Sequence, residues 1–285
     1  MVRLAANLSF LFKELPVLQR FGAAARAGFK HTEFMFAGLN GYEAEAPAVR
    51  AELDAHGLTH VLLNAPAGDW ANGERGTGGV PGRESEFKSS VEYGLRYANE
   101  VGCSRMHIMA GRLVDGADEG TFVERLRWAS GVASDAGVTI CVEPLNANDF
   151  PGYLVPDCAA ALRIIERVGS PDVKLQLDLY HYAMSTRTDA AELRNAVRKL
   201  LPHAAHVQIA NPPGRNEPGV GDVDFPALLA LLDELECTRL AMVASNSRSP
   251  MIKHASSSPQ RAPIKGSSGC RSRSSGRRWL RRMRV

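Results

Sequence analysis

The chain has 285 residues, 45% of them hydrophobic, which suits one globular barrel domain of about 250 residues. Five scattered cysteines argue against a disulfide framework or a zinc knuckle, and they favour a reducing, cytoplasmic compartment. No run approaches 18 apolar residues, so no membrane span is expected. The mildly apolar start is better explained as a first strand than as a signal peptide.

The charge is unevenly distributed along the chain. Residues 246–285 hold nine Arg and two Lys and no acid. Removing these 11 from the 34 basic residues leaves 23 against 31 acidic ones, so residues 1–245 carry a net charge of −8. An acidic body argues against nucleic-acid binding by the whole domain. We predict a barrel domain at 1–245 and a basic, Ser/Arg-rich, disordered tail at 246–285.

Short apolar runs alternate with longer amphipathic segments at a period of roughly 30 residues. A glycine follows five of the amphipathic segments, as expected where a helix ends in a left-handed cap. This alternation predicts an α/β fold, a (β/α)₈ TIM barrel of parallel strands. The expected strands are 3–8, 31–36, 58–64, 104–109, 138–143, 173–178 and 204–210, and the expected helices are 16–27, 43–56, 84–101, 118–136, 156–168, 189–201 and 224–235.

The eighth βα unit departs from this pattern. Residues 240–244 can form a strand, but the Ser-, Arg- and Pro-rich sequence after them cannot bury a core. We therefore expect an eighth unit that is incomplete or replaced by the tail. A second departure is the glycine-rich loop at 64–83, which follows the third strand and is predicted to be a lid over the substrate.

Three of the expected strands carry a polar group at or near the carboxyl end: Glu143, Asp178 and Gln208. Carboxyl ends of barrel strands converge on one face, where TIM barrels build their active sites. Three convergent oxygen groups suggest a hard divalent cation, Mg²⁺ or Mn²⁺. The alternative is that these are ordinary polar residues at strand ends.

Three further residues are candidates for substrate binding. His181 lies three residues after Asp178, in the expected loop above the strand, where an imidazole can bind a substrate oxygen. Arg215 lies in a Gly/Pro-rich segment after Gln208, and its guanidinium suits a carboxylate substrate. His107 ends the fourth strand and could line the pocket or be a core histidine. Exposed surface positions are the alternatives for His181 and Arg215.

At this point the chain resembles the hydroxypyruvate isomerase family of the xylose isomerase-like barrels. Motif order and spacing hold over about 1–236. The matching stretches are AANLSFLF at 5–12, NAPAGDWANGERG at 64–76, VPGRE at 80–84, HIMAG at 107–111, VEPLN at 142–146, QLDLYH at 176–181 and HVQIANPPGRNEP at 206–218.

The resemblance implies an isomerase of a short hydroxy-keto acid, converting hydroxypyruvate to tartronate semialdehyde through an enediolate. It assigns acid–base catalysis to Glu143, a divalent metal to Glu143, Asp178 and Gln208, and substrate contact to His181 and Arg215. No organic cofactor is implied. A homo-oligomer is left open.

The family's second catalytic glutamate belongs to a Gly-Cys-Glu-Tyr motif at the end of the eighth strand. This sequence has Met242-Val-Ala-Ser245 there and no acid after Glu236. Codons for those four residues, read two nucleotides out of step, can encode Gly-Cys-Glu. Our hypothesis is a shifted reading frame from about residue 237, which would weaken or abolish the activity.

Four alternatives to this interpretation can be weighed against the sequence. The substrate could be a 2-oxo-tetronate, or the chain could be a metal-dependent sugar epimerase, although those relatives usually carry histidine where Gln208 stands. A DNA-repair enzyme on this fold would need more strand-end histidines than are present. The non-enzymatic alternative is an inactive barrel whose basic tail binds nucleic acid.

Overall fold

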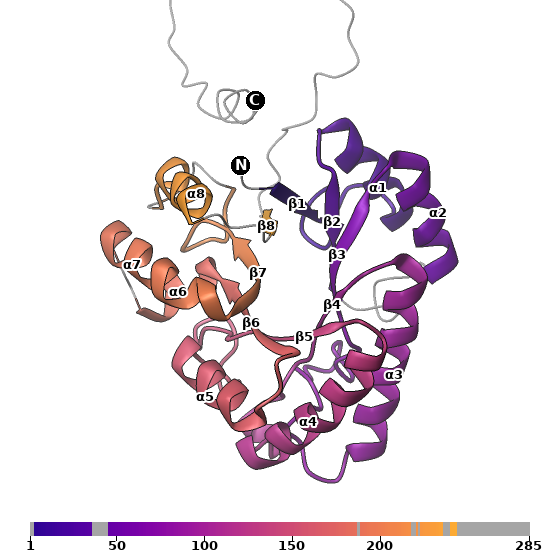
Figure 1. Ribbon diagram of the computed structural model, residues 1–285, viewed down its shortest axis with the longest axis vertical. Helices are drawn as coiled ribbons and strands as arrows, with labels where there is room; N and C mark the ends of the chain where they lie inside the picture. The colour runs from indigo at the N-terminus through magenta and orange to yellow at the C-terminus, as the bar shows by residue number, and fades with distance from the viewer. Residues whose placement is uncertain are drawn as a thin grey trace, which may run out of the picture. The chain divides into compact units, whose positions relative to one another are not determined.

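Eight parallel strands form a closed barrel in the computed structural model (Figure 1). The structure describes residues 3–35, 45–186, 189–217, 221, 223–235 and 240–243. The chain divides into two units, Met1–Asn246 and Ser247–Val285, and all described residues belong to the first. The strands are β1 Arg3–Asn7, β2 His31–Glu33, β3 Thr59–Asn64, β4 Arg105–His107, β5 Thr139–Val142, β6 Val173–Asp178, β7 Ala204–Ile209 and β8 Leu240–Val243.

The α-helices alternate with these strands and lie outside the ring of strands in Figure 1. They are α1 Val17–Arg26, α2 Ala46–His56, α3 Glu84–Val101, α4 Glu119–Asp135, α5 Cys158–Val168, α6 Leu179–Thr186, α7 Ala190–Leu200 and α8 Phe225–Glu234, with 3₁₀ turns η1 Leu113–Asp115 and η2 Leu201–His203. None of the described helices is both long and apolar enough to cross a bilayer.

Local sequence signals account for where several helices begin and end. Asp118 and Asp157 cap α4 and α5 by accepting hydrogen bonds from the backbone N–H groups of Thr121 and Ala160, at 2.9 and 2.8 Å. Such caps satisfy amides that have no partner within the helix. Gly102 ends α3 with φ 73°, a left-handed conformation that glycine adopts without steric penalty.

The predicted barrel is confirmed, and the seven expected strands and seven expected helices all form. The eighth strand also forms, because β8 pairs in parallel with both β7 and β1 and so closes the ring. The predicted tail at 246–285, and any helix after β8, lie outside the described residues.

The glycine-rich segment after β3 is anchored at its second half. Gly78 and Gly79 donate backbone hydrogen bonds to the carbonyls of Met109 and Ala110, at 3.2 and 2.6 Å. A Cβ atom at Gly76 would lie 2.3 Å from the Met109 carbonyl oxygen, so glycine permits this close approach. The predicted lid role of the 64–83 loop stays a prediction.

Candidate active site

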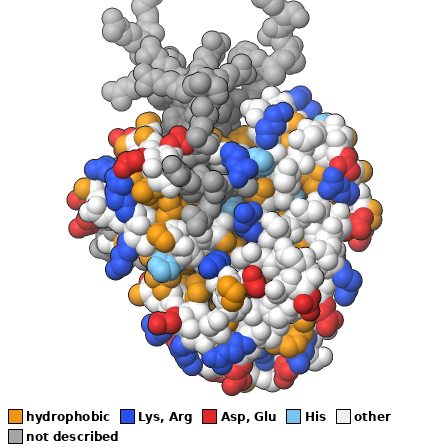
Figure 2. Space-filling view, viewed as in Figure 1, with side chains coloured by type: hydrophobic (Ala, Val, Ile, Leu, Met, Phe, Trp, Pro, Cys, Tyr) orange, Lys and Arg blue, Asp and Glu red, His pale blue; other side chains and the backbone are white. Residues whose placement is uncertain are grey.

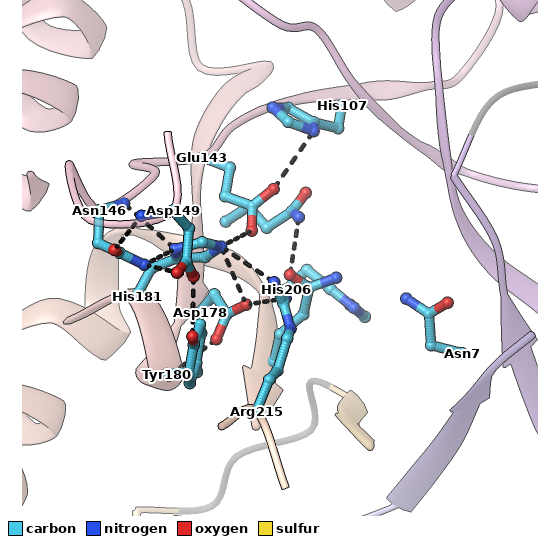
Figure 3. Close-up of polar contacts among 12 residues, drawn as sticks. Asn7, His107, Glu143, Asn146, Asp149, Asp178, Tyr180, His181, His206 and Arg215 are labelled. Carbon is cyan, nitrogen blue, oxygen red and sulfur yellow. Dashed lines mark hydrogen bonds and ion pairs between the residues drawn. The ribbon is translucent and has the colours of Figure 1, made fainter. Parts of the chain in front are cut away.

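Four neighbouring strands, β4 to β7, bring the predicted site residues together at their carboxyl ends (Figure 3). His107 ends β4, Glu143 directly follows β5, and Asp178 ends β6. Asp178 is in register with Gln208 of β7. The position of each residue therefore follows from the strand on which it lies, as in other barrels.

Glu143 is the centre of this group. It is 7% exposed. Its Oε2 lies 3.4 Å from His107 Nδ1, and its Oε1 lies 3.9 Å from His181 Nε2. Burial raises the pKa of Glu143 well above the usual carboxyl value, and the negative charge of Asp178 raises it further, while Arg215 opposes the rise. A carboxylate with raised proton affinity is suited to general base catalysis near neutral pH.

Asp178 is paired with the predicted substrate-binding arginine. Arg215 Nη2 lies 2.7 Å from Asp178 Oδ2. The guanidinium also lies over two aromatic rings, with centroids 4.8 Å away at Phe10 and 4.9 Å away at Tyr180. Arg215 Nε is buried and has no hydrogen-bond partner among the described residues. The arginine is thus held at the site with donor capacity left over for an anion.

His181 lies in helix α6, not in the loop that the sequence predicted. The helix begins directly after β6, because Asp178 Oδ1 accepts a 2.8 Å hydrogen bond from the Tyr180 backbone N–H. In this first turn of α6, His181 Nε2 lies 3.8 Å from Asp178 Oδ2. Burial lowers the pKa of His181 to about 4, with the charge of Asp178 opposing that shift. The imidazole is therefore neutral at pH 7.

His107 lies beside Glu143 and is as buried as a core residue, with 1% exposure. Neither of its ring nitrogens has a hydrogen-bond partner among the described residues. Burial lowers its pKa to about 3, and His181 lowers it further. A buried imidazole with unused polar atoms at the mouth of a barrel is available to a bound ligand.

Gln208 makes hydrogen bonds in two directions. Its Oε1 accepts from Gln176 Nε2 at 3.0 Å, and its Nε2 donates to Glu33 Oε1 at 2.7 Å. Gln176 also donates to Glu143, which moderates the raised pKa of that carboxyl. Gln176 therefore joins Gln208 to the central glutamate.

A second buried network lies deeper among the strands and was missed in the sequence. Glu33 is 1% exposed. Its Oε1 accepts from Asn7 Nδ2 at 2.8 Å as well as from Gln208, and its Oε2 lies 2.6 Å from His206 Nε2. The signal was present, since Glu33 is an acid at the end of the short strand β2. Apolar residues follow Glu33, so the strand was predicted to continue to residue 36. Glu33 therefore did not stand out as an acid at a strand end.

Other contributors come from the segment after β5. Asn146 and Asp149 lie beside His181, and the Tyr180 hydroxyl donates to Asp149 Oδ2 at 2.8 Å (Figure 3). Asparagine and aspartate three positions apart are common in turns, so no sequence signal separated these two from ordinary turn residues.

The donor set fits a divalent cation. Among the described histidine, cysteine, aspartate and glutamate side chains, one group could hold a metal: Glu143, Asp178 and His181, whose ligand atoms lie within 4.8 Å of one another. Two buried carboxylates beside each other favour a cation, because their mutual repulsion is expressed in the raised pKa of Glu143. Arg215 already neutralises part of this charge through Asp178.

Basic and acidic side chains are interspersed on the face seen in Figure 2. The described body therefore shows no single-sign surface there of the kind that a nucleic-acid binder presents.

Comparisons with known proteins agree with this geometry. The family model described as xylose isomerase-like TIM barrel matches residues 21–263. A 2-oxo-tetronate isomerase from Cupriavidus necator is 40% identical over 239 residues, which cover 82% of this chain and 89% of that protein. The hydroxypyruvate isomerase of Escherichia coli K12 is 36% identical over 237 residues, covering 82% and 89%.

A solved structure supports the same assignment. The structure of an AP endonuclease, family 2, from Brucella melitensis superposes with a TM-score of 0.81 and is 39% identical, covering 87% of this chain and 95% of that one. The strand-end carboxylates, the closed eight-stranded ring and these matches agree. The chain belongs to the xylose isomerase-like TIM barrel family, together with relatives named hydroxypyruvate isomerase and 2-oxo-tetronate isomerase.

Proposed function

We propose that this protein is an isomerase of short hydroxy-keto acids, which interconverts hydroxypyruvate and tartronate semialdehyde through an enediolate. The observation that carries the proposal is one buried carboxylate of raised proton affinity, Glu143, facing two convergent donors, His181 and Arg215. Two relatives that are 40% and 36% identical over the aligned residues bear isomerase names of this class.

The reaction needs a base to remove a proton from the carbon of the hydroxymethyl group. Glu143 is assigned this role, because it is buried beside the donors that would hold the substrate. The proton is returned to the neighbouring carbon, which moves the carbonyl by one position. Donors close to the oxygen that gains negative charge lower the barrier.

Substrate binding is assigned to Arg215, His181 and His107. Arg215 would hold the substrate carboxylate, because its Nε has no partner among the described residues and its Nη2 is already directed toward the site. The two imidazoles would contact the substrate oxygens. Both are buried, and Figure 3 shows them on either side of Glu143.

Glu143, Asp178 and Gln208 are the residues that would hold Mg²⁺ or Mn²⁺. Such an ion would supply positive charge next to the developing oxyanion. Arg215 would then share Asp178 with the cation.

A second candidate substrate is a 2-oxo-tetronate, which is favoured by the relative at 40% identity. It has the same hydroxy-keto acid head on a longer chain, so the same residues would serve. Neither a membrane partner nor nucleic-acid binding is expected, and a cytoplasmic location remains a prediction.

Turnover by the purified protein tests the proposal. Hydroxypyruvate and a 2-oxo-tetronate would be supplied separately, each with added Mg²⁺, with added Mn²⁺ and with a chelator. We expect an aldehyde product from hydroxypyruvate, a 3-oxo acid from the 2-oxo-tetronate, or both, and a lower rate with chelator. No turnover of either acid by this chain and by a variant with a complete family C-terminus would contradict the proposal.

A further inference from the structure

The ring nitrogens of His181 face two different environments. Nδ1 faces the segment after β5, where Asn146 lies, and Nε2 faces Glu143, Asp178 and Arg215 (Figure 3). A neutral imidazole carries its proton on one nitrogen only, so the nature of the groups at Nδ1 decides what Nε2 can do.

The groups at Nδ1 are both donors. The Asn146 backbone N–H points at Nδ1 from 3.2 Å, and Asn146 Nδ2 lies 2.7 Å away. The backbone amide can only donate. The side-chain amide is also fixed, because Asn146 Oδ1 accepts the backbone N–H groups of Asn148 and Asp149, at 3.1 and 3.0 Å. The NH₂ end of Asn146 therefore faces His181 and Asp149 Oδ2, 3.1 Å away.

The opposite tautomer would be penalised. A proton on Nδ1 would place it against two N–H donors, one of them at 2.7 Å. The one contact that would favour this tautomer is Arg215 Nη1, 3.3 Å from Nε2. Two donors at Nδ1, one of them at 2.7 Å, outweigh one longer approach at Nε2. The proton therefore belongs on Nε2.

We propose that Asn146 is a positioning residue that fixes His181 as a neutral Nε2–H donor to the substrate oxygen on which negative charge develops. The inference deepens the proposed isomerase function and rests on it for the identity of that oxygen. His181 Nε2–H and Arg215 then direct two donors at the same space beside Glu143. A protonated Nε2 has no lone pair for a metal, so a cation in this site is held by oxygen atoms and not by His181.

The test changes the polarity of one atom at Nδ1. Asn146→Asp keeps the acceptor for the backbone N–H groups of Asn148 and Asp149 but replaces the donating NH₂ by a carboxylate oxygen. That oxygen draws the proton to Nδ1. Asp149→Asn is the matched control, since it breaks contacts in the same turn and leaves both donors at Nδ1. The double variant N146D/D149N restores a donor–acceptor pair between positions 146 and 149 and keeps the acceptor at Nδ1.

The first readout is ¹⁵N NMR of the histidine ring nitrogens in the full chain without substrate, with His181 assigned from a His181→Gln sample. We expect a protonated Nε2 and an unprotonated Nδ1 in the parent and in Asp149→Asn. Both variants that carry Asn146→Asp should show the reverse. A protonated Nδ1 in the parent would overturn the proposal, whatever the substrate is.

The second readout is the split between kcat and KM. Loss of one preorganised donor to an oxyanion costs about 10²–10³-fold in kcat. We expect a kcat loss of that order for both variants with the reversed tautomer, a much smaller loss for Asp149→Asn, and little change in KM. A reversed tautomer with unchanged kcat would refute the positioning role. If neither this chain nor a variant with a complete family C-terminus turns over a hydroxy-keto acid, the proposed function fails while the NMR result still decides the tautomer.

Discussion

Two glutamates among the described residues are buried at strand ends, and their surroundings differ. Glu33 at the end of β2 has both oxygens occupied, by Asn7, Gln208 and His206 at 2.6–2.8 Å. Glu143 after β5 has His107 and His181 at 3.4 and 3.9 Å, beyond ordinary hydrogen-bond distance. The same residue type therefore occurs in two different buried environments.

The difference has a physical consequence. A buried carboxylate whose oxygens both have hydrogen-bond partners is suited to a structural role, because these hydrogen bonds hold the side chain in one conformation. A buried carboxylate with few direct partners, next to a second acid, has a raised pKa and is ready to exchange a proton. We therefore expect Glu143 to control turnover and Glu33 to control stability.

The sharpest test is Glu143→Gln. The amide keeps the shape of the side chain but cannot accept the proton, and general base catalysis contributes about 10²–10⁴-fold. We expect kcat to fall by at least that factor while the free energy of unfolding stays equal or increases, since a poorly paired buried charge is removed. Steady-state kinetics and denaturant unfolding measure the two quantities. Retained activity would show that Glu143 is not the base.

The second test asks whether Glu33 can replace the missing acid. The family places its second catalytic glutamate at the end of the eighth strand, and this sequence has no acid after Glu236. Because Glu33 is fully bonded, we expect it not to substitute. Replacing residues 237–285 by the family's Gly-Cys-Glu-Tyr strand and its following helix should raise kcat by about 10²-fold or more. Equal activity of the two proteins would contradict both the second-glutamate assignment and the shifted-frame hypothesis.

Removing Glu33 should have its main effect on stability. Glu33→Ala leaves three buried polar groups without their partner, and each unsatisfied buried group costs about 1–3 kcal/mol. We expect a lower midpoint of unfolding, with kcat of the remaining folded protein reduced less than in Glu143→Gln. Unchanged stability together with lost activity would place Glu33 in the reaction and reverse the comparison.

Arg215→Ala should raise KM for the carboxylate substrate by about 10–100-fold, because a charge-assisted hydrogen bond contributes about 1.5–3 kcal/mol. Arg215→Lys is the control, since lysine keeps the positive charge but cannot bind a carboxylate in the bidentate manner of a guanidinium. An unchanged KM with a lower unfolding temperature would indicate that Arg215 is a structural partner of Asp178 only.

The sequence predicted the alternation of strands and helices, and it selected most of the residues that the structure brings together. Glu143, Asp178, His107, Gln208 and Arg215 could be placed together because strand ends converge in a barrel. Helix α6 was missed, because its start depends on a side-chain contact, from Asp178 to the backbone of Tyr180.

The sequence pattern could not predict which side chains each acidic residue contacts. These contacts depend on strand register, such as Asp178 opposite Gln208, and on which side-chain atoms then meet across the ring. The role of Asn146 was missed for a related reason, since it rests on the orientation of one amide group in a turn.

The smallest expected effect concerns a buried histidine outside both glutamate groups. Burial lowers the pKa of His60 to about 3, and its Nδ1 is 3.1 Å from the Thr32 hydroxyl. The folded-state pKa lies below the unfolded value of 6.5. The stabilisation is therefore present above pH 6.5 and is lost as the pH falls toward 3, because the unfolded chain binds a proton that the folded chain does not. In His60→Leu, the slope of unfolding free energy against pH between pH 6 and 4 should decrease by up to about 1.4 kcal/mol per pH unit. Urea unfolding at several pH values measures this slope for the parent and the variant. Equal slopes would mean that His60 takes up a proton in the folded barrel, and the acid sensitivity would then have to come from His107, His181 and the carboxylates around them.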